Sequence, residues 1–134
     1  MLLRLTPLFG GNGTTHGIIA MNDTGSDVLT LFNADLLQLG NTQGYAGWHA
    51  PQGIRDANGT ITVFPTILVQ VRLVRDNNTP WGNWIDELAI VKQSGPGIPR
   101  LSGVGIRKVL YIGTRPGNHL LAVSATKYGL ISLF

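Results

Sequence analysis

The tetrapeptide Asp23-Thr24-Gly25-Ser26 brings together residue types that can present a carboxylate on a tight turn. It lies between two apolar runs, residues 17–21 and 28–32, so the turn is expected to end one strand and lead into another. Glycine allows close backbone approach, and the threonine and serine hydroxyls can fix the loop by hydrogen bonds. A carboxylate held in this way can act as a general acid or base. The alternative is an ordinary Asx-type turn at the end of a strand, which uses the same residue types.

The tetrapeptide resembles the catalytic signature of aspartic proteases, in which two carboxylates share a proton beside one water. Such a site needs a second carboxylate, and a chain of 134 residues is too short for two lobes with one motif each. A symmetric homodimer would place Asp23 opposite its own copy. This arrangement is that of the retropepsin family, which the chain resembles. The other aspartates, none of which precedes Thr-Gly or Ser-Gly, are Asp27, Asp35, Asp56, Asp76 and Asp86.

Three further segments are similar to parts of retropepsins. Residues 53–59 and the apolar stretch after them resemble the flap hairpin and its following strand. Leu101-Ser102-Gly103 and residues 104–110 are similar to the apolar-x-Gly segment and the short helix that follows it. Residues 128–134 resemble the terminal strand that interleaves between subunits. The flap residues that the resemblance places against the substrate are Ile54, Arg55, Asp56 and Ala57.

The resemblance also implies a role for each residue of the turn. Asp23 would be catalytic, and the Thr24 hydroxyl would brace the opposite loop across the two-fold axis. The Gly25 carbonyl would bind the substrate main chain, and Ser26 would help to orient Asp23. The substrate would be an extended polypeptide that pairs with the flap as an added strand. The resemblance implies neither a cofactor nor a metal ion, and its partner is a second copy of the chain.

Four features depart from the family pattern. Asn22 precedes the aspartate where an apolar residue is usual, and Ser102 is a small polar residue in the middle of its motif. The segments 41–52 and 76–84 are longer than in the smallest members. These departures bear on substrate preference more than on the fold.

Composition and turn spacing predict an all-β protein. Hydrophobic residues make up 43% and charged residues 13%, and short apolar runs alternate with turns such as Asn12-Gly13. We therefore expect a single domain over residues 1–134, a retropepsin-like closed β-barrel with one short C-terminal helix that acts as a symmetric homodimer. Strands are expected over 2–8, 16–21, 28–32, 62–74, 85–91, 120–124 and 128–134, a helical turn capped by Asn33 over 33–37, a helix over 103–112, loops over 44–52 and 93–99, and turns over 81–84 and 114–118.

The net charge of +3 raises the question of nucleic acid, but the basic residues are scattered and form no run. We interpret the nearest approach to a patch as solvated helix and loop surface, and expect no nucleic-acid partner. That patch consists of Arg100, Arg107, Lys108 and Arg115.

Two alternatives to a protease stay open. One is a non-catalytic dimeric β-barrel that keeps the fold for assembly or for binding a peptide or other ligand. The other is an unrelated small β-barrel that binds nucleic acid or sugar on aromatic platforms. Against the second, we expect Tyr45 and Trp48 to anchor a long loop to the core. The candidate platforms are Tyr45, Trp48, Trp81 and Trp84.

Other residue types narrow the function classes. The chain has no cysteine, which excludes disulfides and thiolate metal sites. His16, His49 and His119 lie in different predicted turns without ligand spacing, so we interpret them as surface or cap residues rather than a metal site. No apolar stretch is long enough to span a bilayer and no signal peptide is apparent, which predicts a soluble protein without membrane contact. A glycosylation sequon at residues 22–24 lies across the catalytic turn, so we expect an intracellular setting.

Overall fold

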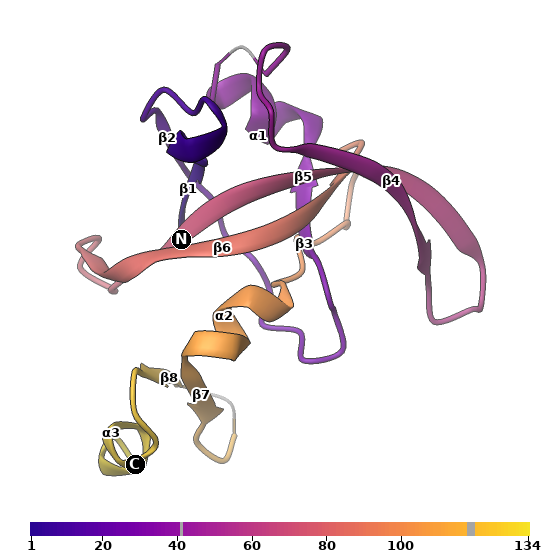
Figure 1. Cartoon of the computed structure of the whole chain (residues 1–134). Coiled ribbons are helices and arrows are strands. Elements are labelled where there is room, and N and C mark those ends of the chain that lie inside the picture. Colours follow the sequence, from indigo (N-terminus) through magenta and orange to yellow (C-terminus); the bar gives the residue numbers. More distant parts are fainter. Residues whose placement is uncertain (41, 118–119) are drawn as a thin grey trace.

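The computed structural model describes residues 1–40, 42–117 and 120–134, and strands dominate it (Figure 1). Six strands form one sheet and two form a second, smaller sheet. The strands are β1 (Leu2–Leu5), β2 (Thr15–Gly17), β3 (Leu29–Phe32), β4 (Trp48–Arg55), β5 (Ile61–Val74), β6 (Pro80–Lys92), β7 (Tyr111–Thr114) and β8 (Leu121–Ser124). The helices are α1 (Asn33–Gln38), α2 (Val104–Val109) and α3 (Lys127–Ser132), with a 3₁₀ turn, η1, at Pro7–Phe9.

The larger sheet has the strand order β2-β1-β5-β6-β3, and β4 pairs with the outer half of β5. Its pairs are antiparallel except β3 with β6, which run parallel. Alternate residues of β5 face the core: Ile67, Val69 and Val71 are fully buried. This alternation is that of a strand, the element that the sequence predicted for residues 62–74. The hydrophobic core to which these residues belong also includes Leu3, Leu5, Leu29, Leu31, Leu39 and Ala89.

The closed barrel predicted from the sequence is not found. The two ends of the larger sheet, β2 and β3, do not pair with each other in the part of the chain that the structure describes. The first strand also ends at Leu5 rather than at residue 8, because Pro7 opens the turn η1. The short edge strands thus leave the sheet open, although its strand-rich character agrees with the prediction.

The predicted flap is a long antiparallel hairpin of β4 and β5 that projects from the sheet (Figure 1). Strand β4 begins at Trp48, so the expectation of a loop as far as residue 52 was wrong. Two residues of β4 lie between the pairs His49↔Thr66 and Gln52↔Phe64, opposite the single residue Pro65. A bulge of this kind accommodates a proline, which cannot donate a ladder hydrogen bond.

The turn between β5 and β6 lies earlier than predicted. Strand β6 begins at Pro80, so residues 81–84 are strand rather than turn. The reversal is made by residues 75–79, where the Arg75 N–H donates to the Thr79 carbonyl at 2.9 Å. Asn78 adopts a positive φ of 64°, which asparagine tolerates better than most residues. The sequence missed this turn because the tryptophan-glycine stretch after it carries equally strong turn residues.

The C-terminal unit, defined as β7, β8 and α3, differs most from expectation. The predicted strand over residues 128–134 is a short helix, α3. The described residues thus form three short α-helices, where one helix and one helical turn were expected. Thr126 caps the helix, because its Oγ1 accepts the Gly129 N–H at 3.0 Å. Gly129 also packs closely on Ser124: a Cβ on this glycine would lie 2.3 Å from Ser124 Oγ. The cap and this close contact outweigh the β-favouring composition of the segment.

Candidate active site

The loop that carries Asp23 is held at both of its ends by one segment, residues 100–102. On the entering side, the Met21 N–H donates to the Arg100 carbonyl at 2.8 Å and the Ser102 N–H donates to the Met21 carbonyl at 2.9 Å. On the leaving side, the Thr30 N–H donates to the Leu101 carbonyl at 2.9 Å. Distant parts of the chain therefore fix where the loop starts and stops.

Within the loop, the Asp23 side chain folds back on its own backbone. The Gly25 N–H donates to Asp23 Oδ1 at 2.9 Å, and the Ser26 N–H approaches the Asp23 carbonyl at 3.3 Å. The Ser26 hydroxyl donates to the Val28 carbonyl at 2.7 Å rather than to Asp23. Asp23 is half-buried, while Thr24 and Gly25 are exposed. The result is a rigid Asx-type turn that leaves part of the carboxylate open to a substrate or a partner.

Two side chains from the 101–107 region bind the backbone of this loop. Ser102, which is 2% exposed, accepts the Asp23 N–H on its Oγ at 3.0 Å. Arg107 Nη1 donates to the Asp23 carbonyl at 2.8 Å and lies 3.3 Å from Ser102 Oγ, while Nη2 donates to the Ser26 carbonyl. The interpretation of Arg107 as solvated surface was therefore wrong. Only the Leu101-Ser102-Gly103 motif in the sequence marked this region.

Helix α2 is itself anchored by a buried carboxylate of β6. Glu87, 3% exposed, accepts the N–H groups of Gly105 at 3.1 Å and Ile106 at 2.7 Å. Burial raises the pKa of Glu87, and the two N–H donors and the cations Arg107 and Lys108 offset this only in part. The contact is close, because a Cβ on Gly105 would lie 2.2 Å from a backbone oxygen of β6. The chain from β6 through α2 to the Asp23 loop thus forms one connected support.

A second buried carboxylate, Asp35 on α1, joins the first half of the chain to the segment before Ser102. Its carboxylate accepts hydrogen bonds from Arg100 Nε at 2.9 Å, from Arg100 Nη2 at 2.8 Å and from the Phe32 N–H at 2.9 Å. It also lies 3.2 Å from His16 Nε2. Burial would raise the pKa of Asp35, but the hydrogen bonds from Arg100 and Phe32 and the charge of Arg100 bring it below its usual value. Asp35, rather than the predicted Asn33, therefore holds the start of α1. Arg100 and His16 are likewise not free surface residues.

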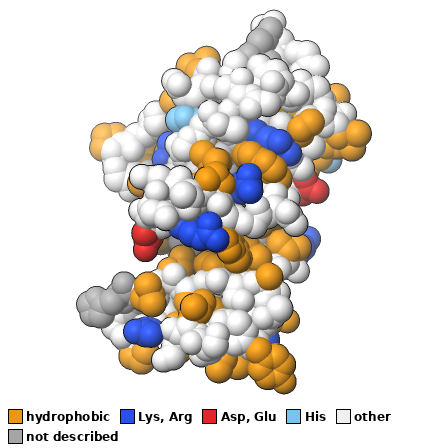
Figure 2. Space-filling model, turned by 90° about the vertical axis from the view of Figure 1, so that its left-hand side faces the viewer, with side chains coloured by type: hydrophobic (Ala, Val, Ile, Leu, Met, Phe, Trp, Pro, Cys, Tyr) orange, Lys and Arg blue, Asp and Glu red, His pale blue; other side chains and the backbone are white. Residues whose placement is uncertain are grey.

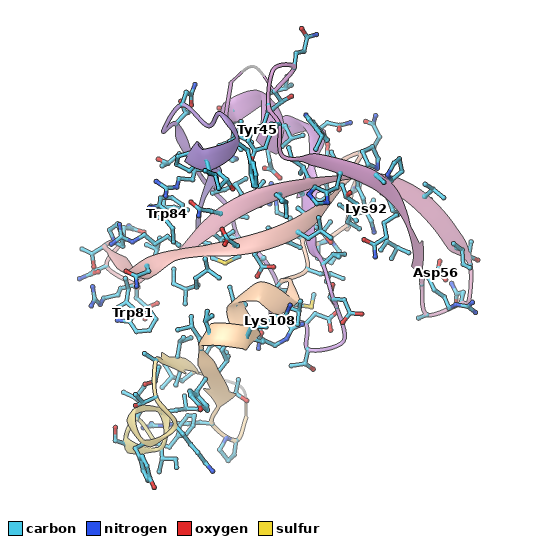
Figure 3. All side chains as sticks on the ribbon, in the orientation of Figure 1. Tyr45, Asp56, Trp81, Trp84, Lys92 and Lys108 are labelled. Carbon is cyan, nitrogen blue, oxygen red and sulfur yellow. The ribbon has the colours of Figure 1, made fainter. Side chains whose placement is uncertain are left out.

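The predicted flap residues lie on the β4–β5 hairpin but make no hydrogen bond or ion pair with the Asp23 loop in the described residues. Ile54 is half-buried, and the three residues after it are exposed. At the hairpin tip, Asp56 Oδ1 accepts the N–H groups of Asn58 at 2.9 Å and Thr60 at 3.0 Å (Figure 3). Gly59 there has a φ of +82°, the left-handed conformation that favours glycine. The exposed residues are Arg55, Asp56 and Ala57.

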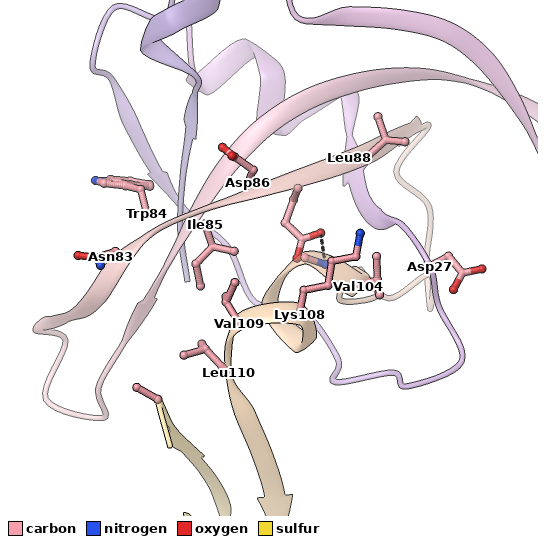
Figure 4. A pocket seen from close by; sticks show the side chains of 13 residues that line it. Asp27, Asn83, Trp84, Ile85, Asp86, Leu88, Val104, Lys108, Val109 and Leu110 are labelled. Atoms are coloured by element: carbon pink, nitrogen blue, oxygen red, sulfur yellow. Dashed lines mark hydrogen bonds between the residues drawn. The ribbon is translucent and has the colours of Figure 1, made fainter. Parts of the chain in front are cut away.

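A cavity of about 700 Å³ lies between β6 and α2 (Figure 4). Asp27, just past the Asp23 turn, lines one end, and Lys108 and Trp84 also contribute, but Asp23 does not. A second, more apolar pocket of about 180 Å³ adjoins the turn itself and is lined by Asn22, Ser102, Ile106, Ile112, Leu121 and Val123 among others. The smaller pocket thus connects the Asp23 region with the C-terminal unit.

Tyr45 and Trp84, two of the four aromatic residues considered as platforms for nucleic acid or sugar, contact other residues of the chain. Tyr45 is 6% exposed, and its hydroxyl donates to the Leu68 carbonyl at 2.6 Å and accepts the Thr6 N–H at 2.9 Å. It is a loop anchor, as the sequence suggested. Trp84 lies under the guanidinium of Arg4, whose central carbon is 4.1 Å from the ring centroid (Figure 3).

Comparisons with protein-family models, with curated proteins and with solved structures found no match to this chain. Among the described residues, no group of three or more metal-ligating side chains could hold an ion. His49 is exposed on β4, and His119 lies outside the described residues. Within that same part of the chain, no helix is long and apolar enough to cross a membrane.

Proposed function

We propose that this chain is an aspartic endopeptidase that works as a symmetric homodimer, with one Asp23 from each copy. The observation that carries the proposal is the Asp23 turn: a partly open carboxylate on a Thr-Gly-containing loop whose backbone is fixed by Ser102 and Arg107. Reactive groups that are fixed before substrate binds reduce the entropy cost of reaching the transition state. An ordinary surface Asx turn needs no such buried support.

The proposed reaction is general acid and base catalysis on a bound water. Two carboxylates about 3 Å apart cannot both hold a charge at modest cost, so one Asp23 is ionised and the other protonated. The ionised carboxylate removes a proton from water, and the protonated one polarises the scissile carbonyl. Attack gives a tetrahedral diol, which collapses once the leaving nitrogen is protonated. The Gly25 carbonyl and the β4–β5 hairpin bind the main chain of an extended polypeptide.

The second copy is proposed to bind against the C-terminal unit. Strands β7 and β8 form a sheet of two, and neither pairs with a third strand among the described residues, a situation that favours pairing with another chain. Several clusters of apolar side chains lie on this lower part of the molecule, and few charged side chains lie among them (Figure 2). The smaller pocket supports this proposal, because Asn22 beside the Asp23 turn and Leu121 and Val123 of the C-terminal unit line it together. A two-fold axis at this surface is proposed to bring the two turns together. The exposed apolar residues are Tyr111, Leu121, Tyr128, Ile131, Leu133 and Phe134.

The test is cleavage of a diverse peptide library, read by mass spectrometry from pH 3.5 to 7.5, with the oligomeric state measured by sedimentation velocity. Wild type is expected to be dimeric and to cleave with a bell-shaped pH profile. Asp23→Asn keeps the shape of the side chain but removes the shared charge, so cleavage should fall at least a thousandfold while the dimer persists. Asp76→Asn, in the exposed β5–β6 turn, makes the same charge change and should cleave like wild type.

A dimeric wild type that cleaves nothing would refute the protease and favour a dimeric binding module of the same architecture. Cleavage that survives in Asp23→Asn would indicate a contaminating enzyme or a different mechanism. A proposed intracellular location follows from the sequon at residues 22–24, because a glycan on the exposed Asn22 would obstruct the turn.

A further inference from the structure

We propose that Ser102 and Arg107 are positioning residues that set the geometry of the catalytic carboxylate from within each chain. This inference rests on the proposed endopeptidase function, and it assigns to a serine hydroxyl and a guanidinium the task of holding Asp23 by its backbone. We call the two side chains the Ser102–Arg107 brace.

The brace holds the Asp23 residue on both sides of its Cα. Ser102 Oγ accepts the N–H of Asp23, and Arg107 Nη1 donates to its carbonyl, so both main-chain polar groups are fixed. Nη2 of the same guanidinium donates to the Ser26 carbonyl, at the other end of the turn. A planar guanidinium fork that binds two carbonyls fixes their relative position as well as their distance. The Cα–Cβ bond of Asp23, and hence its carboxylate, is therefore directed by the brace.

The two side chains of the brace also depend on each other. The Ser102 hydroxyl has two acceptor sites, and Asp23 N–H and Arg107 Nη1 approach it at 3.0 and 3.3 Å. Ser102 is 2% exposed, so water cannot take over either bond if the oxygen is lost. Arg107 in turn sits on α2, whose first N–H groups are held by Glu87. The hydroxyl is thus the point at which the rigid β6–α2 support meets the catalytic turn.

Thr24, by contrast, has an exposed side chain and can brace the turn only across a dimer axis. The Ser102–Arg107 brace acts within one chain, so the turn is shaped before the dimer forms. This predicts that loss of the Ser102 hydroxyl lowers the rate of the chemical step while leaving substrate affinity, dimerisation and the pH limits of cleavage nearly unchanged.

The test compares Ser102→Ala with Ser102→Thr, with Ser94→Ala as the matched control in an exposed loop. Ser102→Ala is expected to lower kcat about a hundredfold with KM within about twofold of wild type, because a small misplacement of a catalytic group has an effect of this size. Ser102→Thr keeps the acceptor oxygen, and Ser102 lines the small apolar pocket, which can accommodate an extra methyl group, so this variant should recover most of the lost kcat. Ser94→Ala should match wild type.

A second readout does not depend on activity. Amide hydrogen exchange at Asp23, followed by NMR, should be about tenfold faster in Ser102→Ala and near normal in Ser102→Thr, because one hydrogen bond has been removed and restored. If the alanine variant folds poorly, Arg107→Lys serves instead: it keeps the charge but lacks the fork, and should lower kcat without moving the pH limits.

Unchanged exchange at Asp23, or an unchanged kcat despite faster exchange, would overturn the positioning role. A rise in KM equal to the fall in kcat/KM, or a threonine variant as impaired as the alanine one, would also overturn it. A wild type that cleaves nothing refutes the proposed function and with it the catalytic role of the brace. In that case the exchange measurement still decides whether the brace itself is real.

Discussion

The Asp35 network offers the sharpest test of what holds the region around the Asp23 turn together. Replacing Asp35 by asparagine keeps the size of a side chain that is 1% exposed but removes its negative charge. The two bonds from Arg100, at 2.9 and 2.8 Å, then meet a neutral group, and one amide hydrogen points at a donor. Breaking a buried pair by removing one partner costs about 3–5 kcal/mol. Because the Arg100 and His16 side chains are 24% and 27% exposed, water recovers part of this, and we expect a loss of about 2–3 kcal/mol.

The pH dependence of the free energy of unfolding tests independently whether the charge of Asp35 stabilises the fold. The pKa of Asp35 is lower in the folded chain than the value of about 3.9 for a free aspartate. Its contribution to the free energy of unfolding is therefore complete above about pH 4 and is lost as pH falls through the lower folded value. Wild type and Asp35→Asn should differ most at neutral pH, and their difference should shrink in acid.

Urea denaturation, followed by tryptophan fluorescence at pH 7, 5, 4 and 3, measures both quantities. Asp76→Asn is the matched control, because that aspartate is exposed in the β5–β6 turn and should cost less than about 0.5 kcal/mol. The reasoning fails if Asp35→Asn costs no more than the control at pH 7. It also fails if the difference between wild type and variant stays constant from pH 5 to pH 3.

Two further substitutions probe packing and assembly. Gly103→Ala should lower the free energy of unfolding by about 1–3 kcal/mol, because its Cβ would lie 2.8 Å from the Leu29 backbone nitrogen. Gly17→Ala, whose Cβ would meet no atom within 4 Å, is its control, and equal thermal midpoints for the two would contradict the close packing of the 101–103 segment. Ile131 lies on α3 and is 57% exposed. Ile131→Lys should weaken dimerisation at least tenfold in sedimentation velocity, because the substitution buries a charge at the proposed interface. Leu37→Lys on α1, 79% exposed and far from α3 in Figure 1, should not, and equal dimer affinity in both variants would remove the C-terminal unit from the interface.

The elements that the sequence predicted correctly are those that depend on residues close together in the chain. The Asp23-Thr24-Gly25-Ser26 turn follows from its turn residues and the apolar runs beside it, and helix α2 follows from the helical spacing after Gly103. The predicted helix was too long, however, because it ran to residue 112 and β7 begins at Tyr111. The β4–β5 hairpin was expected from the resemblance to the retropepsin flap. The strand expected over residues 62–74 agrees with the central strand β5 to within one residue, because a long run of apolar and β-branched residues favours a strand whatever it pairs with. The anchoring of Tyr45 was also foreseeable, since a large aromatic in a polar loop gains most by burial.

The tertiary structure decided what depends on residues far apart in the chain. Arg107 binds a carbonyl 84 positions earlier, and Ser102 an amide 79 positions earlier, so no local pattern distinguishes these side chains from solvated ones. The same holds for Asp35, whose partner Arg100 is 65 positions away. Helix α3 replaced a predicted strand because a threonine cap and a close glycine contact outweighed intrinsic β preference, which is a weak and context-dependent term. The sequence by itself thus determined the Asp23 turn, and only long-range packing determined how that turn is held.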